Sequence, residues 1–590
     1  MYSRIVCAAL MIASLVPAAA EAPRKKLIEY GWDVPAPSFV ATHIREMEKQ
    51  PFEGVIVRVP TIGTVFANKK WDEAQVAAEL AAMERIEWGK FTDNFVIMYA
   101  ASTMDWFSDA DWECVLHNVA LCAKAAKLGR CKGLCFDAEP YGKNPWHYPT
   151  QPRAKEKSFT EYQAIARRRG AQFMAKIQET LPAPVIHTFF QLSYFPHVAS
   201  LADPAERDRR LSREHYGLLP AFLNGMLDVA NPGTRITDGN EASYYYTTAE
   251  EYFRAFHNIK QTALSLVAPE NRAKYLAQVQ CSQALYVDYL FKYWSRSTPA
   301  THMTPEERAR WFEHNVYWAL NTSDEYVWLY SEKMNWWKGE NIPPGLPEAI
   351  IAAKEKLAAR KPLGFDMAAI IDRAKAAEEK EIRSRLEERE ARIHRIGTRE
   401  HPPVIDGQLD DALWQQVPAL DAFRRPAAGT QGDLQAQTFA RVAYDSEKLY
   451  VAIRCEEPTP EKMQVAGKHR DDDVWLGESV DLFLAPGKER TPYVHLILNP
   501  ANVRWDARCA EEDDLAWNPD YETAVSVGKD AWCVEIALPW KALGRSAPKR
   551  GEKLLANIGR QRAHAREISS WSICLKGFVE PDRFGTWIFR

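Results

Sequence analysis

Two acidic residues close a short apolar run near position 137. Residues 132–141 read KGLCFDAEPY, so the carboxylates of Asp137 and Glu139 stand two positions apart just before Pro140. In an extended strand, residues two apart point to the same side, and a proline marks the end of the pairing. Two carboxyl groups on one face provide a proton donor and a second group that attacks, or activates water, in the hydrolysis of a sugar–sugar bond. The pair could instead cap a turn or bind an arginine.

Further acidic and aromatic residues close other predicted strands. We expect Glu139 to be the acid/base, Glu241 or Glu332 to be its partner, and Asp137 to tune Glu139 through its nearby charge. Aromatic rings suit the apolar faces of sugars, although each ring taken alone is more often part of a core. The expected substrate contacts in this part of the chain are Trp32, Tyr194, Asp238, Tyr244, Trp328, Tyr330 and Trp336.

The elements that must position these residues alternate between strands and helices. Eight short apolar runs are predicted as strands, at 27–33, 54–60, 94–101, 133–141, 185–194, 234–241, 275–283 and 326–332. Amphipathic stretches lie between them at 39–49, 71–86, 161–179 and 305–320. Eight strand–helix units in about 300 residues predict a (β/α)8 barrel, which carries its catalytic groups at the carboxyl ends of its strands. A doubly wound sheet is the alternative, but no Gly-x-Gly-x-x-Gly follows the first strand.

The N-terminus predicts export, and the chain as a whole predicts several domains. Residues 1–22 have the pattern of a cleaved secretory signal, and no later run is long and apolar enough for a bilayer span, so we expect a soluble extracellular or periplasmic protein. We expect a barrel at 23–345, a helical linker at 346–397 whose second helix spans 366–395, and an all-β sandwich at 398–590. The formal charge of −4 with interspersed acids and bases does not favour nucleic acid or an anionic membrane as a partner.

The motifs of the C-terminal part follow one another in a familiar order. They are VIDGQLDDALW at 404–414, AYDSEKLYVA at 443–452, ESVDLFL at 478–484, WCVEIALPW at 532–540, and then NIGR, WS and RFG at 557–560, 571–572 and 583–585. This part resembles the carbohydrate-binding modules of family 9. The resemblance implies a β-sandwich that holds a sugar end between two tryptophans, with Trp475, Trp505, Trp517 and Trp571 as candidates, and it allows a structural calcium ion, for which residues 471–473 offer three carboxylates.

Three functions remain open at this stage. The first is a secreted glycoside hydrolase with a carbohydrate-binding module, because the barrel resembles glycoside-hydrolase barrels in layout. Its Asp-x-Glu resembles enzymes that use a substrate acetamido group, but their longer Asp-x-x-Asp-x-Asp-x-Glu signature is absent. The second is a non-catalytic glycan-binding protein, since fold does not imply activity. The third is a haem-binding redox module on a related sandwich, with Met463, His469 and His495 as axial candidates. For the hydrolase we expect no required cofactor and no catalytic metal.

Overall fold

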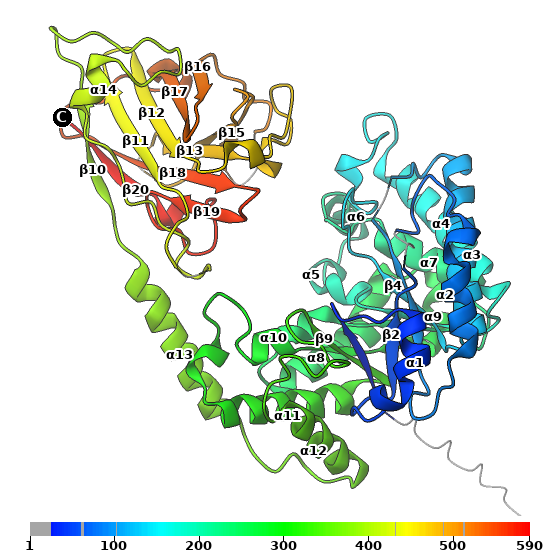
Figure 1. Cartoon of the computed structure of the whole chain (residues 1–590). Helices are drawn as coiled ribbons and strands as arrows, with labels where there is room; N and C mark the ends of the chain where they lie inside the picture. Colours follow the sequence, from blue (N-terminus) through cyan, green and yellow to red (C-terminus); the bar gives the residue numbers. More distant parts are fainter. Residues whose placement is uncertain (1–24, 61–63, 102, 431, 488, 511–513) are drawn as a thin grey trace, which may run out of the picture. The chain divides into compact units, whose positions relative to one another are not determined.

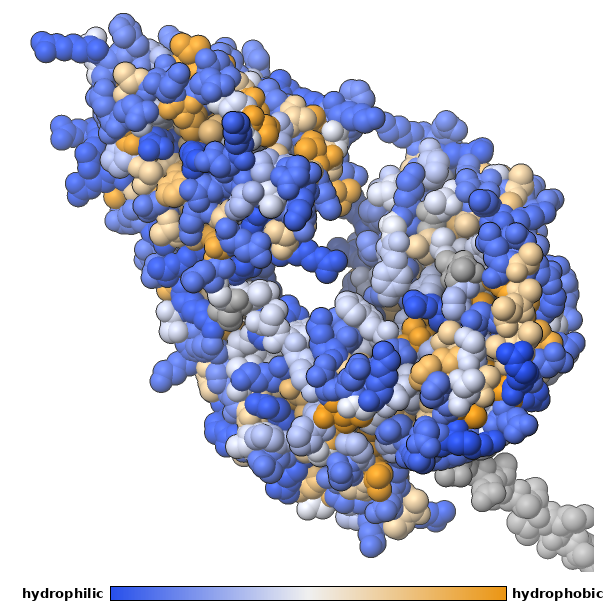
Figure 2. Space-filling view, in the orientation of Figure 1, coloured by the Kyte–Doolittle hydropathy of each residue, from blue (hydrophilic) through white to orange (hydrophobic). Residues whose placement is uncertain are grey.

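The protein divides into two compact units. The computed structural model describes all residues except 1–24, 61–63, 102, 431, 488 and 511–513, and the signal sequence expected at 1–22 lies outside the described residues. The first unit runs to Tyr293 and includes Thr304–Ala369; the second comprises Trp294–Met303 and Ile370–Arg590. Hydrophilic and apolar residues are interspersed on the visible face of each unit (Figure 2). None of the helices formed by the described residues has the length and apolar composition of a bilayer span.

The first unit is built on a parallel sheet with helices outside it (Figure 1). Its strands are β1 (Lys26–Gly31), β2 (Gly54–Val57), β3 (Phe95–Tyr99), β4 (Gly133–Asp137), β5 (Val185–Thr188), β6 (Arg235–Asp238), β7 (Val279–Cys281), β8 (Gln283–Tyr286) and β9 (Tyr326–Ser331). Only Ser282 separates β7 from β8. Because β7 pairs with β6 and β8 pairs with β9, this one extended segment closes the ring. The predicted eight-membered (β/α)8 barrel is confirmed.

Eight helices follow the eight strand positions. They are α1 (Pro37–Met47), α2 (Glu73–Arg85), α3 (Asp109–Leu128), α4 (Phe159–Gln178), α7 (Leu219–Val229), α8 (Ala249–Lys260), α11 (Pro305–Thr322) and α12 (Leu346–Ala358). Shorter helices lie in the connections, namely α5 (Pro196–Ala199), α6 (Pro204–Leu211), α9 (Arg272–Gln278) and α10 (Val287–Leu290). Helices α4 and α11 begin with capping boxes, Ser158 with Glu161 and Thr304 with Glu307, so both starts are encoded locally.

Several predicted elements have different ends in the structure. The seventh strand begins at Val279 instead of residue 275, because Tyr275 belongs to α9, whose sequence RAKYLAQ consists mainly of strong helix formers. The helix expected at 366–395 is wrong in its last part. Helix α13 (Ala368–Arg385) ends earlier, and β10 (Glu390–Arg395) is a strand in which Ala391 and Ile393 are buried at alternate positions. Helix α12, which was expected to be part of the linker, packs on α11 and supplies the eighth helix of the barrel.

Aromatic side chains fill the inside of the barrel. Trp328 stacks on Phe189 with ring centroids 4.3 Å apart, and Tyr30 packs against Phe189 at 4.6 Å. The indole Nε1 of Trp328 donates a hydrogen bond to the backbone oxygen of Gly239 at 2.9 Å. Trp328 is 1% exposed, so this layer forms a closed floor beneath the carboxyl ends of the strands. We call the space above this floor the mouth of the barrel.

The second unit is an antiparallel-rich sheet that curls around one core. After β10 and α14 (Ala412–Gln416) its strands are β11 (Thr438–Tyr444), β12 (Lys448–Glu456), β13 (Ser479–Ala485), β14 (Tyr493–Leu498), β15 (Arg504–Cys509), β16 (Glu522–Val527), β17 (Ala531–Pro539), β18 (Lys553–Arg562), β19 (Glu567–Ser570) and β20 (Gly585–Phe589). Strand β10 pairs with β20 on one side and β11 on the other, which joins the two halves. Apolar side chains of both halves share a core that contains Val451, Leu482, Ile536 and Trp587. The predicted all-β sandwich is confirmed.

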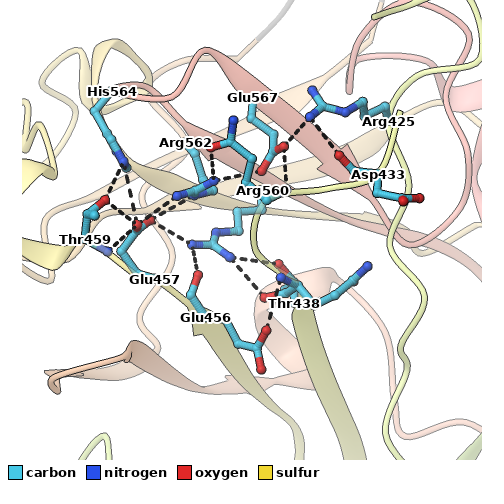
Figure 3. A network of polar contacts seen from close by, with 12 residues as sticks. Arg425, Asp433, Thr438, Glu456, Glu457, Thr459, Arg560, Arg562, His564 and Glu567 are labelled. Atoms are coloured by element: carbon cyan, nitrogen blue, oxygen red, sulfur yellow. Dashed lines mark hydrogen bonds and ion pairs between the residues drawn. The ribbon is translucent and has the colours of Figure 1, made fainter. Parts of the chain in front are cut away.

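A buried ion network crosses this unit (Figure 3). Glu457 is fully buried, and its two carboxylate oxygens accept hydrogen bonds from Nε and Nη2 of Arg562 at 2.9 and 2.8 Å. Arg560 lies 3.4 Å from the same carboxylate, and Arg562 also donates to Glu567 at 3.0 Å. Burial raises the pKa of Glu457, but the hydrogen bond and charge of Arg562 outweigh it and leave the pKa below its ordinary value. The network fixes the end of β12 against β18.

The Glu457→Gln variant should destabilise the second unit. The substitution removes one negative charge and leaves two buried guanidinium groups without full compensation, which costs about 3–5 kcal/mol. Because the folded pKa is lowered, the carboxylate stabilises the fold at neutral pH and loses that effect as the pH falls through its folded pKa. The difference between wild type and variant in a calorimetric melt should therefore be large at pH 7 and shrink in acid. Glu461→Gln, an exposed change close by, is the matched control. Equal melting temperatures at pH 7 would contradict this role.

Candidate functional site

Asp137 and Glu139 lie at the mouth, as the sequence predicts, although the strand ends at the first of them. Asp137 is the last residue of β4 and is fully buried, and its Oδ1 accepts a hydrogen bond from the backbone N–H of Glu139 at 2.9 Å. Its Oδ2 is buried without a hydrogen-bond partner among the described residues. Burial, followed by the charges of Glu139 and Glu241, raises the pKa of Asp137 well above its ordinary value. The three carboxyl groups therefore form one cluster.

The position of Glu241 in this cluster depends on Gly239, where no other residue fits. A Cβ at Gly239 would lie 2.1 Å from the backbone oxygen of Thr188, so only glycine lets the chain pass beside β5. Asn240 then adopts a left-handed conformation with φ of 42°, and its side chain donates to Gln283 at 2.7 Å. Glu241 follows at the start of the 3-10 helix η3 (Glu241–Tyr245). Burial, together with the charge of Glu139, raises the pKa of Glu241 to about 8.

Tyrosine side chains surround the carboxyl cluster. The hydroxyl of Tyr141 donates a hydrogen bond to Oε2 of Glu139. Tyr244 is 5% exposed, and its pKa is raised by burial and then by Glu241. Burial and then Glu139 raise the pKa of Tyr216 in the same way. Each hydroxyl therefore keeps its proton at neutral pH and can donate a hydrogen bond.

Sequence reasoning missed Tyr216 as a site residue. It lies between α6 and α7, far along the chain from any predicted strand end, and no motif surrounds it. Tyr141 could have been predicted as a site residue, because it belongs to the same short run as the two acids.

Glu332 lies on another side of the mouth. Its Oε1 accepts hydrogen bonds from the hydroxyls of Tyr286 at 3.1 Å and Tyr330 at 3.5 Å, and its backbone N–H donates to Asp288 at 2.9 Å. It does not contribute to the raised pKa of Glu241, whose causes are burial and Glu139. The geometry thus groups Glu241, rather than Glu332, with Glu139.

A cavity of about 760 Å³ opens at the mouth. Its lining includes both Glu139 and Glu332, and Trp32 lies at its edge with 62% of its surface exposed. Lys333 places its Nζ 5.1 Å from the centre of the Trp32 ring. The full lining is Tyr30, Gly31, Trp32, Val34, Arg58, Thr64, Tyr99, Ala101, Glu139, Tyr141, Tyr330 and Glu332. A concave space with exposed aromatic rings and several carboxyl groups suits a sugar chain.

Three expected contact residues have structural roles instead. Asp238 is fully buried, and its carboxylate accepts the backbone N–H groups of Gln191 and Ser193 at 2.9 and 2.8 Å, which shapes the loop that carries Tyr194. Trp328 belongs to the floor described above. Trp336 is 2% exposed and packs edge-on against Phe52 at 4.9 Å. The sequence could not separate these residues from exposed ones. A position at a strand end predicts which way a side chain points, but not how deeply it is buried.

Tyr194 does reach the surface, in agreement with the expectation. It is 39% exposed and packs edge-on against Tyr216 with ring centroids 4.8 Å apart. Burial and then the charges of Glu214 and Glu241 raise its pKa, so it stands near the carboxyl cluster.

The candidate tryptophans of the second unit differ in exposure. Trp475 is 40% exposed, whereas Trp571 is 4% exposed and belongs to the core. Trp517 also packs against the core. Trp505 touches Trp475 edge-on, with ring centroids 5.6 Å apart and an interplanar angle of 80°. Rings in such contact leave no space for a sugar between them, so the free face of Trp475 is the available platform.

The expected cation and haem ligands are engaged in other contacts. The carboxylate of Asp472 accepts the backbone N–H groups of Lys468 and His469 at 2.7 and 2.9 Å, which holds a turn, and a calcium ion at 471–473 stays a prediction. Met463 packs against the core, and His495 is bonded to Asp481 through Nε2 at 2.8 Å. Haem ligation by Met463, His469 or His495 stays a prediction.

One group of described residues has the ligand spacing of a metal site. Suitable atoms of Glu457, Glu478 and His564 lie within 4.8 Å of one another. The charge of Glu457 is already neutralised by Arg560 and Arg562, however, so a second cation there would meet two guanidinium groups. We assign this cluster to the ion network of the fold.

Comparisons with known proteins agree with this division. Residues 405–589 match the family model described as carbohydrate family 9 binding domain-like. Among curated proteins, none matches this chain. A family 9 carbohydrate-binding module from Caldicellulosiruptor kristjanssonii in complex with cellotriose is 19% identical with a TM-score of 0.26, and the match covers 34% of this chain and 94% of that one.

The barrel matches other solved structures. A GH5-4 broad specificity endoglucanase from Clostridum cellulovorans is 13% identical with a TM-score of 0.33, over 56% of this chain and 94% of that one. A GH18 chitinase from Pseudoalteromonas aurantia is 12% identical with a TM-score of 0.27, over 56% and 100%. At these identities and TM-scores the matches carry no argument about substrate. Residues 405–589 thus resemble a family 9 carbohydrate-binding module, and the structures matched by the N-terminal unit are glycoside-hydrolase barrels.

Proposed function

We propose that the barrel is a glycoside hydrolase and that the C-terminal module binds its glycan substrate. The observation that carries the proposal is the pair formed by Glu241, whose pKa is raised to about 8, and Glu139 at the mouth of the barrel. A carboxyl group that keeps its proton at neutral pH, beside a second carboxyl group, is the arrangement that cleavage of a glycosidic bond requires. Export through the N-terminal signal sequence is part of the same proposal.

The roles follow from the proton positions. Glu241 donates its proton to the oxygen of the leaving sugar, and Glu139 acts on the anomeric carbon, directly or through water. The sequence alone had suggested Glu139 as the acid/base, but burial favours the neutral form of Glu241. The hydroxyl of Tyr141 donates to Glu139 and fixes the direction of its carboxylate. Burial also raises the pKa of Asp137, whose Oδ2 has no hydrogen-bond partner among the described residues, and this favours its protonated form beside Glu139.

Two substitutions distinguish the roles of the carboxyl groups. Glu139→Gln should lower turnover by roughly 100-fold or more on every glycoside, because the group that acts on the anomeric carbon is lost. Glu241→Gln should lose as much on a natural glycan but far less on an aryl glycoside with a good leaving group, which needs little protonation. Initial rates on both substrate types provide the test.

Glu113→Gln, an exposed change on α3, is the control and should leave both rates unchanged. Equal losses for Glu241→Gln on the two substrate types would contradict its role as proton donor. Unchanged rates in Glu139→Gln would remove the hydrolase proposal and favour a barrel that only binds glycans.

Trp475→Ala should weaken glycan binding by the second unit by about tenfold. An exposed ring that serves as a stacking platform contributes more than about 1 kcal/mol, and 1.4 kcal/mol corresponds to a tenfold change in affinity. Binding of cello-, xylo- and chito-oligosaccharides to the full chain by calorimetry provides the measurement. Leu476→Ala removes a neighbouring apolar side chain that is 65% exposed and should have no effect. Equal effects of both changes would show that general surface apolarity, and not the ring, supports binding.

A further inference from the structure

One basic residue stands inside the acidic mouth. Among the described residues that line the 760 Å³ cavity, Arg58 is the only lysine or arginine, and its side chain is exposed. It follows the last residue of β2, and its backbone N–H donates to Pro35 at 3.0 Å, which fixes its direction at the strand end. An exposed cation at this position can be hydrated, balance the carboxyl groups of the site, or bind a ligand.

The contacts of Arg58 show that it does not balance a carboxylate. Its guanidinium donates to the hydroxyl oxygen of Tyr99, whose pKa is raised mainly by burial and pulled back by the Arg58 charge. No described residue forms an ion pair with Arg58. Other arginines of the barrel are paired, such as Arg153 with Asp105 at 2.7 Å and Arg169 with Asp109 at 2.6 Å. A guanidinium has five N–H donors, so Arg58 retains donors that face the cavity.

The distance between Arg58 and the carboxyl cluster identifies the part of a ligand that it would meet. Strands β2, β3 and β4 are neighbours, with Val57 beside Val96 and Tyr99 beside Asp137. Arg58 is level with Cys135, two residues before Asp137, so two strand spacings of about 4.8 Å each and a two-residue offset place its backbone roughly 12 Å from that of Asp137. That is beyond the reach of one hydrogen bond. Arg58 therefore meets a sugar next to the one at the carboxyl cluster, near the exposed ring of Trp32.

We propose that Arg58 binds an acidic group on the glycan, a carboxylate or a sulfate, so that the mouth selects negatively charged sugar chains. A guanidinium forms paired hydrogen bonds with both kinds of oxyanion. The mouth tolerates such a ligand because burial raises the pKa values of Asp137 and Glu241, which favours the uncharged form of both. The proposal deepens the proposed hydrolase function and rests on it for the orientation of the substrate.

Binding to a chain that carries Glu139→Gln tests the proposal without turnover. The probes are hexagalacturonate as the carboxylate source, a heparin hexasaccharide as the sulfate source and cellohexaose as the neutral reference. We expect at least one acidic probe to bind at least tenfold more tightly than cellohexaose, and to bind more weakly as salt rises. Adding Arg58→Gln should remove that tenfold preference, since a charge-assisted hydrogen bond is lost. Arg58→Lys should retain part of it.

The matched control is Arg168→Gln, which removes an exposed charge from α4 that pairs with Asp109. It should leave every affinity unchanged. The second unit is the same in all variants, so its contribution cancels when the affinity for one probe is compared between variants. The proposal is overturned if cellohexaose binds as tightly as the acidic probes, if no acidic probe binds, or if Arg58→Gln changes nothing. Cleavage of neutral glycans by wild type and Arg58→Gln alike would overturn it while leaving the hydrolase function intact.

Discussion

The protein holds three carboxyl groups together at one end of a barrel, and the cost of their mutual repulsion shapes the site. Asp137 is fully buried and Glu241 is half-buried, and burial, followed by the charge of Glu139, raises the pKa of both. Like charges in a poorly hydrated space cannot all ionise, so protons stay on the cluster at neutral pH. Retained protons are what an acid catalyst needs. In the proposed function, the same electrostatic cost that opposes the fold provides the proton donor.

Packed surroundings hold these carboxyl groups in place despite their repulsion. Below the cluster, the stacked rings of Trp328, Phe189 and Tyr30 form a floor that excludes water. Beside it, Gly239 lets the chain pass close to β5 and deliver Glu241. Parallel strands bring groups from distant parts of the sequence to one edge, which explains how residues 100 positions apart share a proton environment.

Much of this arrangement could be predicted from the sequence. Alternation of apolar runs with helical patterns gave the eight strands and the barrel, and strand ends that carry acids pointed to Asp137, Glu139 and Glu241. The pattern could not give depth, so Asp238 and Trp328 were expected to contact substrate although both are buried. The predicted strands were also too long, because a polar residue after an apolar run is compatible with both strand and loop.

Other features depended on contacts that no local pattern encodes. Tyr216 reaches the site from a long connection. Arg58 has no ion pair among the described residues, which no local pattern could show. The strand β10 was hidden because the charged residues around Ala391 and Ile393 continue the composition of the helix before them. Pairing with β20 and β11 decided its conformation, which is a tertiary effect that overrides local propensity.

Direct titration of the Glu241 carboxyl group tests the central claim. Carbon-13 NMR of protein labelled at the glutamate side-chain carboxyl carbon, with Glu241→Gln used to assign the signal, follows its protonation with pH. The account predicts a midpoint near 8, because burial and the charge of Glu139 both favour the protonated form, and a lower midpoint in Glu139→Gln. A midpoint near 4.5 in the wild-type protein would mean that Glu241 is ionised at neutral pH, and it would contradict the proton-donor role on which the proposed function depends.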